Sequence, residues 1–335
     1  SGGKLSDAHQ AEIEKLLRAD PRDTEPDGGP PVHELALEDA YLTHLVTDVG
    51  AGLALTGMTL ALDCANGGGS RVAPKVFGRL GAQVHVIAAE PDGDNINREC
   101  GSTFPEALQA EVRAHGAQIG IALDGDGDRC VLVDERGNLV NGDGILTVIA
   151  RWAAEAGKLS DPRIVATVMS NRGLHRALRE RGVSVVEVPV GDRAVVEAMR
   201  REHLWLGGEQ SGHIILAGED GTIGDGVVTA LAVLRVMRET ARPLSELVAP
   251  YQPLPQVLRN VPVSSKPDLS ELPEILERVR QVEQELGRDG RVLVRYSGTE
   301  DLARIMVEGP DQAQIQRSVD SLATMFESRL GPHAR

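Results

Sequence analysis

The chain uses one local plan twice: an apolar strand, a turn that contains glycine, a short helix and a second apolar strand. The first copy begins at Thr59 with TLALDCANGGGS, SRVAPKVFGRLG and AQVHVIAA, and the second begins at Arg163 with RIVATVMS, NRG, LHRALRERG and VSVVEVPVG. A period of about a hundred residues is too long for a solenoid, whose repeats span about 20–50 residues. Because each copy has the pattern of a βαβ unit, the repeat predicts two similar α/β domains.

The composition suits cores built from such units. Apolar residues make up 41% of the chain but aromatic residues only 2%, so Val, Leu, Ile and Ala must fill the cores. Side chains of this kind are typical of buried parallel strands that are covered by helices. We therefore predict an α/β protein in which two similar three-layer α/β domains span residues 51–155 and 156–255.

The segment before the repeat has a different pattern. Amphipathic spacing predicts a helix over residues 5–19, and a second helix is expected over 34–50. Residues 20–33 between them are rich in proline, glycine and aspartate, which predicts an exposed linker. Residues 1–50 thus form a leading segment without a sheet of its own.

The segment after the repeat predicts a third, smaller domain. Proline is dense near 249–268, which marks a boundary. Beyond it we expect helices at 270–286 and 311–329, together with the strands RVLVRYS and ARIMVEG. Residues 256–335 therefore predict a C-terminal α+β domain.

Charge and cysteine content limit the partners. A net charge of −15 argues against nucleic acid and anionic membranes, whose phosphates would be repelled, but leaves small phosphorylated ligands open. No apolar run approaches the roughly 18 residues of a membrane span. Three cysteines, Cys64, Cys100 and Cys130, are too few and too scattered for a disulfide framework or a zinc site. A reducing, cytoplasmic location is the expectation.

The sequence GIALDGDGDRCVLVD predicts a metal site between two apolar strands. Asp124, Asp126 and Asp128 alternate with glycines, so the backbone can curl until three carboxylates meet at one hard cation. An EF-hand is the nearest alternative, but Arg129 occupies the position where that loop needs glycine, and the flanks are strands. A solvated acidic turn without metal is the other alternative. Mg²⁺ is the expected ion, because a few carboxylates plus a phosphate suit it.

The stretch LGGEQSGHI at 206–214 predicts a loop that recognises sugar hydroxyls. Glu209, Gln210, Ser211 and His213 offer a carboxylate, an amide, a hydroxyl and an imidazole within five residues. His213 could also act as a general acid or base. The alternative is a polar turn with a satisfied histidine. The nearby TIGDG at 222–226 is expected to support this loop and is assigned no chemistry.

The stretch RYSGTED at 295–301 predicts a nest for a phosphate dianion. A guanidinium, two hydroxyls and an open backbone N–H lie close together there, and Arg304 on the next strand could add charge. The alternative is a capped turn. The donors are Arg295, Ser297, Gly298 and Thr299.

The three loops in this order, DGDGDR, GEQSGH and RYSGTE, resemble those of the α-D-phosphohexomutase family over essentially the whole chain. Within that family the resemblance is nearest to the bacterial branch that acts on glucosamine phosphates. It is carried by LDCANGGG, EPDGDNINRECGST, ATVMSN, VGDR and Gln210. This likeness implies an isomerase, an intramolecular phosphotransferase that interconverts glucosamine 6-phosphate and glucosamine 1-phosphate through a phosphoserine and a bisphosphate intermediate. It implies a role in amino-sugar nucleotide synthesis and leaves a homodimer open.

The resemblance also implies roles for single residues. The three aspartates would bind Mg²⁺, and Arg129 would lie beside the reacting phosphoryl group. Glu209 and Ser211 would hold sugar hydroxyls, with His213 close to them. The residues expected to hold the non-reacting phosphate are Arg295, Ser297, Gly298 and Thr299.

The chain departs from the family pattern in two ways. Tyr296 and Asp301 stand where prolines are common, which loosens the phosphate loop but keeps its donors. The family's serine lies in a Thr-Ala-Ser-His-Asn-Pro-like loop of the first domain, and no Ser-His pair occurs in the printed sequence. We therefore expect residues 1–50 to be the helical remnant of a further α/β domain, and the chain by itself to be inactive. The alternatives are a phosphomannomutase or phosphoglucomutase, and a non-catalytic, metal-dependent sugar-phosphate-binding protein.

Overall fold

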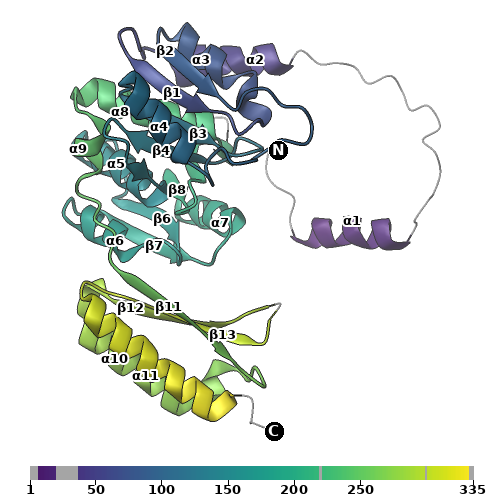
Figure 1. Cartoon of the computed structure of the whole chain (residues 1–335), viewed down its shortest axis with the longest axis vertical. Coiled ribbons are helices and arrows are strands. Elements are labelled where there is room, and N and C mark those ends of the chain that lie inside the picture. The colour runs from purple at the N-terminus through teal and green to yellow at the C-terminus, as the bar shows by residue number, and fades with distance from the viewer. Residues whose placement is uncertain (1–6, 20–36, 219–220, 299, 332–335) are drawn as a thin grey trace. The chain divides into compact units, whose positions relative to one another are not determined.

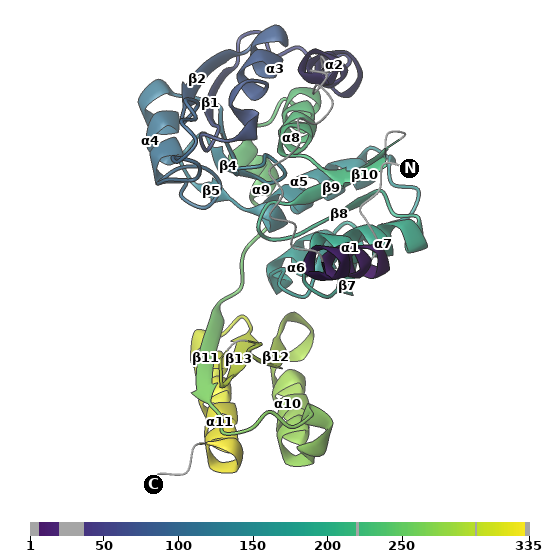
Figure 2. The same cartoon turned by 90° about the vertical axis from the view of Figure 1, so that its right-hand side faces the viewer.

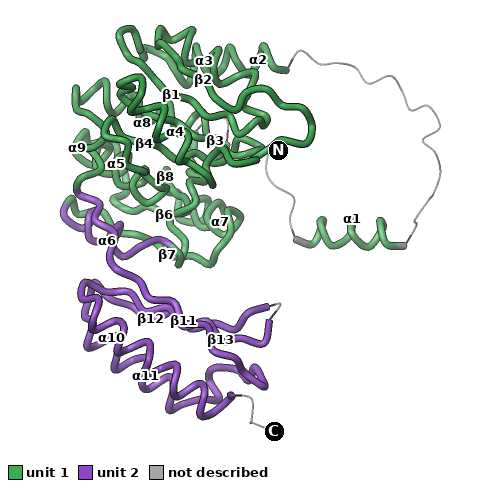
Figure 3. Tube along the Cα trace, viewed as in Figure 1, with its two compact units in different colours: residues 1–169, 181–249 green, residues 170–180, 250–335 purple. Residues whose placement is uncertain are grey.

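The computed structural model describes residues 7–19, 37–218, 221–298 and 300–331 (Figure 1). The chain divides into two compact units (Figure 3), one of residues 1–169 and 181–249 and one of residues 170–180 and 250–335. Among the described residues, no helix combines the length and the apolar character that a membrane crossing requires.

The first sheet lies in the first unit and has the strand order β2-β1-β3-β4-β5. The central strand β1 runs parallel to β2 and β3, and β4 runs antiparallel to β3. Helix α4 covers one face and α8 (Gly226–Thr240) lies against the other, so the central strands β1, β3 and β4 are buried between two layers of helices (Figure 2). The other elements are β1 (Thr59–Asp63), α3 (Ala73–Arg79), β2 (Gln83–Ile87), α4 (Glu106–His115), β3 (Ile119–Leu123), β4 (Cys130–Asp134) and β5 (Leu139–Val140).

The second sheet repeats the topology of the first. Its order is β10-β9-β8-β6-β7, with β6 parallel to β7 and β8, and β9 antiparallel to β8. Strands β6 to β10 therefore correspond one by one to β1 to β5, and the predicted pair of similar α/β domains is confirmed. The elements are β6 (Arg163–Thr167), β7 (Ser184–Val188), α7 (Asp192–Glu202), β8 (Leu206–Gly208), β9 (Ile214–Gly218) and β10 (Gly221–Gly224).

Two further helices that the sequence analysis did not predict complete the first unit. Helix α5 (Gly142–Glu155) packs against α8 and contacts strands of both sheets, so the two sheets share these helices as a common layer. Asn141 caps α5 by accepting from the backbone N–H of Gly144. The short helix α9 (Leu244–Val248) also packs on α5.

The leading segment is helical where it is described. Helix α1 (Asp7–Ala19) matches the expected helix at 5–19, and its apolar residues Ile13, Leu16 and Leu17 are exposed. Helix α2 (Leu37–His44) continues into a π-helical turn at Leu45–Val49, where Leu45 is buried. The linker predicted at 20–33 lies outside the described residues.

The second unit contains a three-stranded antiparallel sheet of order β11-β13-β12. Two helices pack on it over a core that includes Val261, Ile305 and Phe326, which confirms the predicted α+β domain. The stretch 249–268 was predicted only as a boundary, yet it contains the strand β11. An edge strand tolerates a proline such as Pro262, so dense proline did not exclude a strand here. The elements are β11 (Gln256–Pro262), α10 (Pro273–Leu286), β12 (Arg291–Tyr296), β13 (Leu302–Glu308) and α11 (Gln312–Leu330).

Helix α6 (Arg172–Arg179) follows β6 in the chain but belongs to the second unit by its contacts. Its first residue donates its backbone N–H to Glu308 Oε1 over 2.6 Å. The second oxygen of Glu308 accepts from Arg291 Nε over 2.7 Å, and Arg291 Nη2 donates to the carbonyl of Ser170 over 2.7 Å. Burial raises the pKa of Glu308, although the arginine and the backbone N–H oppose this. A buried, paired carboxylate therefore fixes the start of α6 to the small domain.

Asp63, at the end of β1, holds the loops that border the predicted metal site. Its side chain is fully buried, and its two oxygens accept from the backbone N–H groups of Ala65 and Gly101, each over 2.8 Å. Both of these residues have positive φ, 55° at Ala65 and 75° at Gly101, so the chain turns sharply at each contact. Burial raises the pKa of Asp63 more than the two N–H donors lower it.

We expect Asp63→Asn to lower the free energy of unfolding by about 1–3 kcal/mol, because the new amide NH₂ would face a backbone N–H and leave a buried donor unpaired. Urea unfolding measures the change. Asp94→Asn, at an exposed position, is the control and should have little effect. Equal midpoints for the two variants would contradict the role given to Asp63.

Candidate active site

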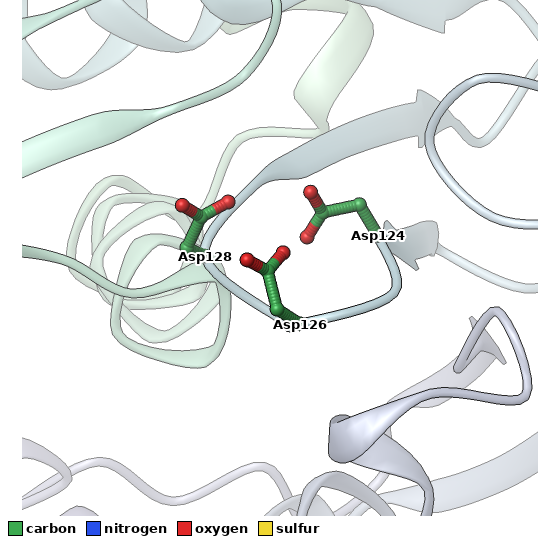
Figure 4. A group of neighbouring side chains, drawn as sticks. All are labelled: Asp124, Asp126 and Asp128. Carbon is green, nitrogen blue, oxygen red and sulfur yellow. The ribbon is translucent and has the colours of Figure 1, made fainter. Parts of the chain in front are cut away.

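The loop 124–129, the predicted metal loop, connects β3 to β4 and brings the three predicted metal ligands together. Leu123 and Cys130 pair across the antiparallel strands, so the loop closes a hairpin. Each of Asp124, Asp126 and Asp128 offers a carboxylate oxygen, and these oxygens lie within 4.8 Å of one another. Figure 4 shows the three side chains pointing toward one region inside the loop. The alternation of aspartate and glycine thus has the geometry that the sequence predicted.

The electrostatics of this group fit a cation. Burial raises the pKa of Asp124 to about 6, and the charges of Asp128 and Asp126 add to the rise, while the backbone N–H of Arg129 opposes it. Asp128 Oδ1 is buried and has no hydrogen-bond partner among the described residues. A hard dication would remove the repulsion between the carboxylates and would bind the oxygen that accepts no hydrogen bond. The loop residues therefore fit a divalent metal.

Arg129 also lies at this group of carboxylates. Its Nε is 3.5 Å from Asp124 Oδ2 and 3.8 Å from Asp128 Oδ1. The EF-hand alternative receives no support, because Glu135, which would be its last ligand, instead accepts from the backbone N–H and the hydroxyl of Ser245. The guanidinium is thus at the metal loop, where the resemblance puts it, and its role toward a phosphoryl group stays a prediction.

Backbone contacts that require glycine enclose the metal loop. A β-carbon at Gly67 would lie 2.2 Å from the carbonyl oxygen of Gly125, and one at Gly226 would lie 2.6 Å from that of Arg129. On a further side, the side chain of Asn97 would be 2.7 Å from a β-carbon at Gly125. The LDCANGGG turn and the 90–103 loop therefore pack directly on the metal loop and limit how far it can open.

The predicted sugar loop, residues 209–213 of the stretch LGGEQSGHI, occupies the equivalent hairpin of the second sheet, between β8 and β9. The two hairpins meet, because Cys130 donates its backbone N–H to the carbonyl of Gly212 over 3.0 Å. A β-carbon at Gly212 would lie 2.3 Å from the carbonyl oxygen of Cys130, and the φ of Gly212 is 97°. The repeated fold thus brings two corresponding hairpins into contact.

His213 joins the sugar loop to the metal loop. Its side chain is buried, and its Nδ1 is 3.2 Å from Asp128 Oδ2. Its other nitrogen, Nε2, would be 1.9 Å from a β-carbon at Gly224, so only glycine fits there. The histidine is satisfied, as the alternative interpretation held, but its partner is a predicted metal ligand. This contact makes His213 a support for Asp128, and its role as acid or base stays a prediction.

The other sugar-loop residues divide into anchored and exposed ones. Glu209 Oε1 accepts from the backbone N–H of Gly191, in the VGDR stretch, over 3.1 Å. Gln210 Nε2 donates to Asp143 Oδ2, at the start of α5, over 2.9 Å. Ser211 is exposed at the tip of the loop. The loop is therefore held at its base and open at its tip.

The predicted phosphate loop lies in the second unit, between β12 and β13. Arg295 and Gly298 are exposed, whereas Ser297 is buried and its hydroxyl accepts from the backbone N–H of Glu300 over 3.3 Å. Thr299 lies outside the described residues. Arg304 is already paired, since its Nη2 donates to Glu300 Oε2 over 2.8 Å.

Lys266 contacts this loop from outside it, and sequence reasoning missed this residue. Its Nζ donates to the carbonyl of Ser297 over 3.0 Å and lies 3.3 Å from Asp301 Oδ1. It comes from the proline-dense stretch, about thirty residues before the loop, so no local pattern connects the two. Asp301, one of the two departures from the family pattern, thus has a partner in the fold. The hydroxyl of Tyr296, the other departure, is buried without a hydrogen-bond partner among the described residues.

Comparison with protein families matches three consecutive models. They describe phosphoglucomutase/phosphomannomutase alpha/beta/alpha domain II over residues 39–137, alpha/beta/alpha domain III over 141–254 and the C-terminal domain over 258–325. The chain belongs to the phosphoglucomutase/phosphomannomutase family. This result confirms the predicted family and, with it, an enzyme of the phosphohexomutase isomerases.

Curated members of the family are similar to the chain over nearly all of its length. It is 48% identical to the phosphoglucosamine mutase of Moorella thermoacetica, over 96% of this chain and 73% of that protein. It is 46% identical to the phosphoglucosamine mutase of Rhizobium etli, over 96% of this chain and 72% of that protein. The chain thus spans about three quarters of the length of these relatives.

The fold of the chain is similar to that of solved structures. A phosphoglucomutase/phosphomannomutase family protein from Burkholderia thailandensis superposes with a TM-score of 0.69 at 23% identity, over 89% of this chain and 66% of that one. N-acetylphosphoglucosamine mutase from Aspergillus fumigatus, in complex with GlcNAc-6P and magnesium, gives a TM-score of 0.67 at 20% identity, over 86% and 70%. At these identities the likeness shows the fold alone.

We expect Gly67→Ala to destabilise the protein by about 1–3 kcal/mol, because its β-carbon would overlap the carbonyl of Gly125 and push the metal loop away. Gly68→Ala is the matched control, since its β-carbon would be 3.7 Å from its nearest neighbour, an ordinary contact. Thermal and urea unfolding compare the two variants. Equal stability of both would show that the metal loop is not confined by this turn.

Proposed function

We propose that the chain is the metal- and substrate-binding part of a phosphoglucosamine mutase, which interconverts glucosamine 6-phosphate and glucosamine 1-phosphate in the cytoplasm. The observation that carries the proposal is the contact between His213 of the sugar loop and Asp128 of the metal loop. Through it, a cation site and a sugar-binding loop form one packed structure. Relatives at 46–48% identity carry the name phosphoglucosamine mutase, which supports this sugar. The same four-part division, 1–50, 51–155, 156–255 and 256–335, is part of the proposal.

The proposed metal is Mg²⁺, held by Asp124, Asp126 and Asp128. Three carboxylates within 4.8 Å, and a buried oxygen on Asp128 that accepts no hydrogen bond among the described residues, support a small hard dication. A bound dication would neutralise charge on a phosphoryl group during transfer, which is the main requirement of this chemistry. Arg129, at the edge of the carboxylates, would add a positive charge directed at the same group.

The remaining loops orient the sugar phosphate. The Glu209 carboxylate would accept hydrogen bonds from sugar hydroxyls, and the Ser211 hydroxyl would exchange hydrogen bonds with them. The anchored base of their loop would keep both residues in place. In the second unit, the exposed guanidinium of Arg295 and the backbone of Gly298 would bind the phosphate that does not react, together with Ser297 and Thr299. Lys266 would hold that loop through the carbonyl of Ser297.

The transfer itself requires a phosphoserine, which would give its phosphoryl group to the sugar phosphate to form a bisphosphate. After the bisphosphate reorients, the other phosphoryl group returns to the serine. The printed residues contain no Ser-His pair of the kind found in the family's serine loop. The proposal therefore assigns to this chain the binding of metal and sugar phosphate, and not the phosphoryl carrier.

We expect the 335-residue chain to bind Mg²⁺ weakly, because a ligand from the phosphoserine is missing from its carboxylate set. Isothermal titration should give an affinity weaker than micromolar, and Asp126→Asn should remove the binding altogether. Asp94→Asn, an exposed aspartate outside the loop, should leave it unchanged. Micromolar binding, or equal binding by Asp126→Asn and the wild type, would contradict the proposed metal site.

We expect the pure chain to show no mutase turnover, even with glucose 1,6-bisphosphate present, because it lacks the nucleophile. A coupled assay on glucosamine, mannose and glucose phosphates tests this, and measurable turnover would refute it. If the gene encodes a serine loop upstream of Ser1, the longer product should prefer glucosamine phosphate. Preference for mannose or glucose phosphate would favour a phosphomannomutase or phosphoglucomutase, and no turnover on any of the three would favour a binding protein.

A further inference from the structure

Asp225, in the TIGDG stretch that was assigned no chemistry, connects two parts of the first unit. Its Oδ1 caps α8 by accepting from the backbone N–H groups of Val227 and Val228, over 2.8 and 3.0 Å. Its Oδ2 accepts from the hydroxyl of Tyr41 over 2.6 Å, across 184 residues of sequence. Capping the helix needs only the first oxygen. The second oxygen ties the start of α8 to α2.

The neighbours of Asp225 contact the candidate active site on both sides. Gly226 donates its backbone N–H to the carbonyl of Gly127, inside the metal loop, over 2.9 Å. Gly224 packs against the imidazole of His213 so closely that no β-carbon fits between them. His213 in turn contacts Asp128. A movement of Asp225 would therefore shift the backbone of the metal loop and the support of one of its ligands together.

Tyr41 is suited to hold Asp225 in place. Burial and the adjacent carboxylate raise the pKa of its phenol, so the hydroxyl stays protonated and donates. The segment that carries it is packed through Leu42 and Leu45, which are both buried. A second tie fixes the same segment elsewhere, since Arg235 Nη2 donates to the carbonyls of Val49 and Ala51 over 2.8 and 3.1 Å. The hydrogen bonds of Tyr41 and Arg235 thus attach the segment to α8, and the bond of Tyr41 lies at the end of α8 that contacts the metal loop.

We propose that Asp225 and Tyr41 are positioning residues: their hydrogen bond fixes the start of α8, and through it the metal loop and His213, in the geometry that binds the cation. The expected effect on cation binding rests on the proposed metal function, but the contact between α8 and the metal loop can be tested without a metal.

The experiment compares four variants of the 335-residue chain. Tyr41→Phe removes only the hydroxyl, and Asp225→Ala removes both the cap and the tie. Asp225→Asn is the conservative variant, because its amide oxygen can still cap α8 and its NH₂ can donate to Tyr41. Arg235→Met is the matched control, since it loosens the same segment at the point that does not reach the metal loop.

Two readouts are measured for each variant. The affinity for Mn²⁺ is measured from the paramagnetic effect of the ion. It should fall about tenfold in Asp225→Ala and less in Tyr41→Phe, and Asp225→Asn should recover most of the lost affinity. Amide hydrogen exchange of Gly226, whose N–H bonds to the metal loop, should speed up in the same order. Arg235→Met should lower the melting temperature while both readouts stay at wild-type values. If Tyr41 and Asp225 only stabilised the fold, Arg235→Met would change the two readouts as well.

The outcomes separate this inference from the proposed function. If the wild type binds no Mn²⁺, the proposed metal site fails, and the exchange of Gly226 still decides the inference. Unchanged exchange and affinity in Tyr41→Phe would overturn it, as would equal changes in Arg235→Met. Should Asp225→Ala fail to fold, Tyr41→Phe against Arg235→Met remains the deciding comparison.

Discussion

Everything in the candidate site depends on holding three carboxylates close together against their mutual repulsion. At the observed spacing of up to 4.8 Å, each ionised pair costs about 3 kcal/mol at an effective dielectric constant of about 20. The loop withstands this because rigid backbone surrounds it: Gly67 and Gly226 approach its carbonyl groups more closely than any residue with a β-carbon could, and Gly212 does the same at Cys130, just after the loop. Confinement by glycine contacts, together with a cation that would remove the repulsion, explains why the loop has this shape.

The repeated topology explains how that confinement arises. The hairpins β3–β4 and β8–β9 correspond to each other in two equivalent sheets that share the layer of α5 and α8, and their loops meet directly. One copy carries aspartates and the other carries the polar cluster around Glu209 and His213. The two copies thus share one backbone plan, while their loops carry different polar side chains. The contact of Cys130 with Gly212 is where the two copies join.

Family membership and local geometry support different parts of the functional argument. The family models and the relatives at 46–48% identity bear on which reaction class the chain belongs to. The contacts of His213, Asp128 and Arg129 bear on what these side chains can do, and they favour a supporting role for the histidine. The structure also shows that Lys266 donates to Ser297 in the predicted phosphate loop. It shows that Tyr41 donates to Asp225, whose neighbour Gly226 bonds to the metal loop.

The sequence by itself determined what neighbouring residues do together. Alternating aspartate and glycine at 124–128 predicted the convergence of three carboxylates, because the backbone geometry of five residues suffices for it. Likewise, the apolar strands and the repeated βαβ pattern predicted two similar sheets. Only the tertiary structure decided that His213 supports Asp128, that Tyr41 holds Asp225, and that a proline-rich boundary forms an edge strand. These contacts join residues far apart in the chain, so they depend on how sheets and helices pack, which no local pattern specifies.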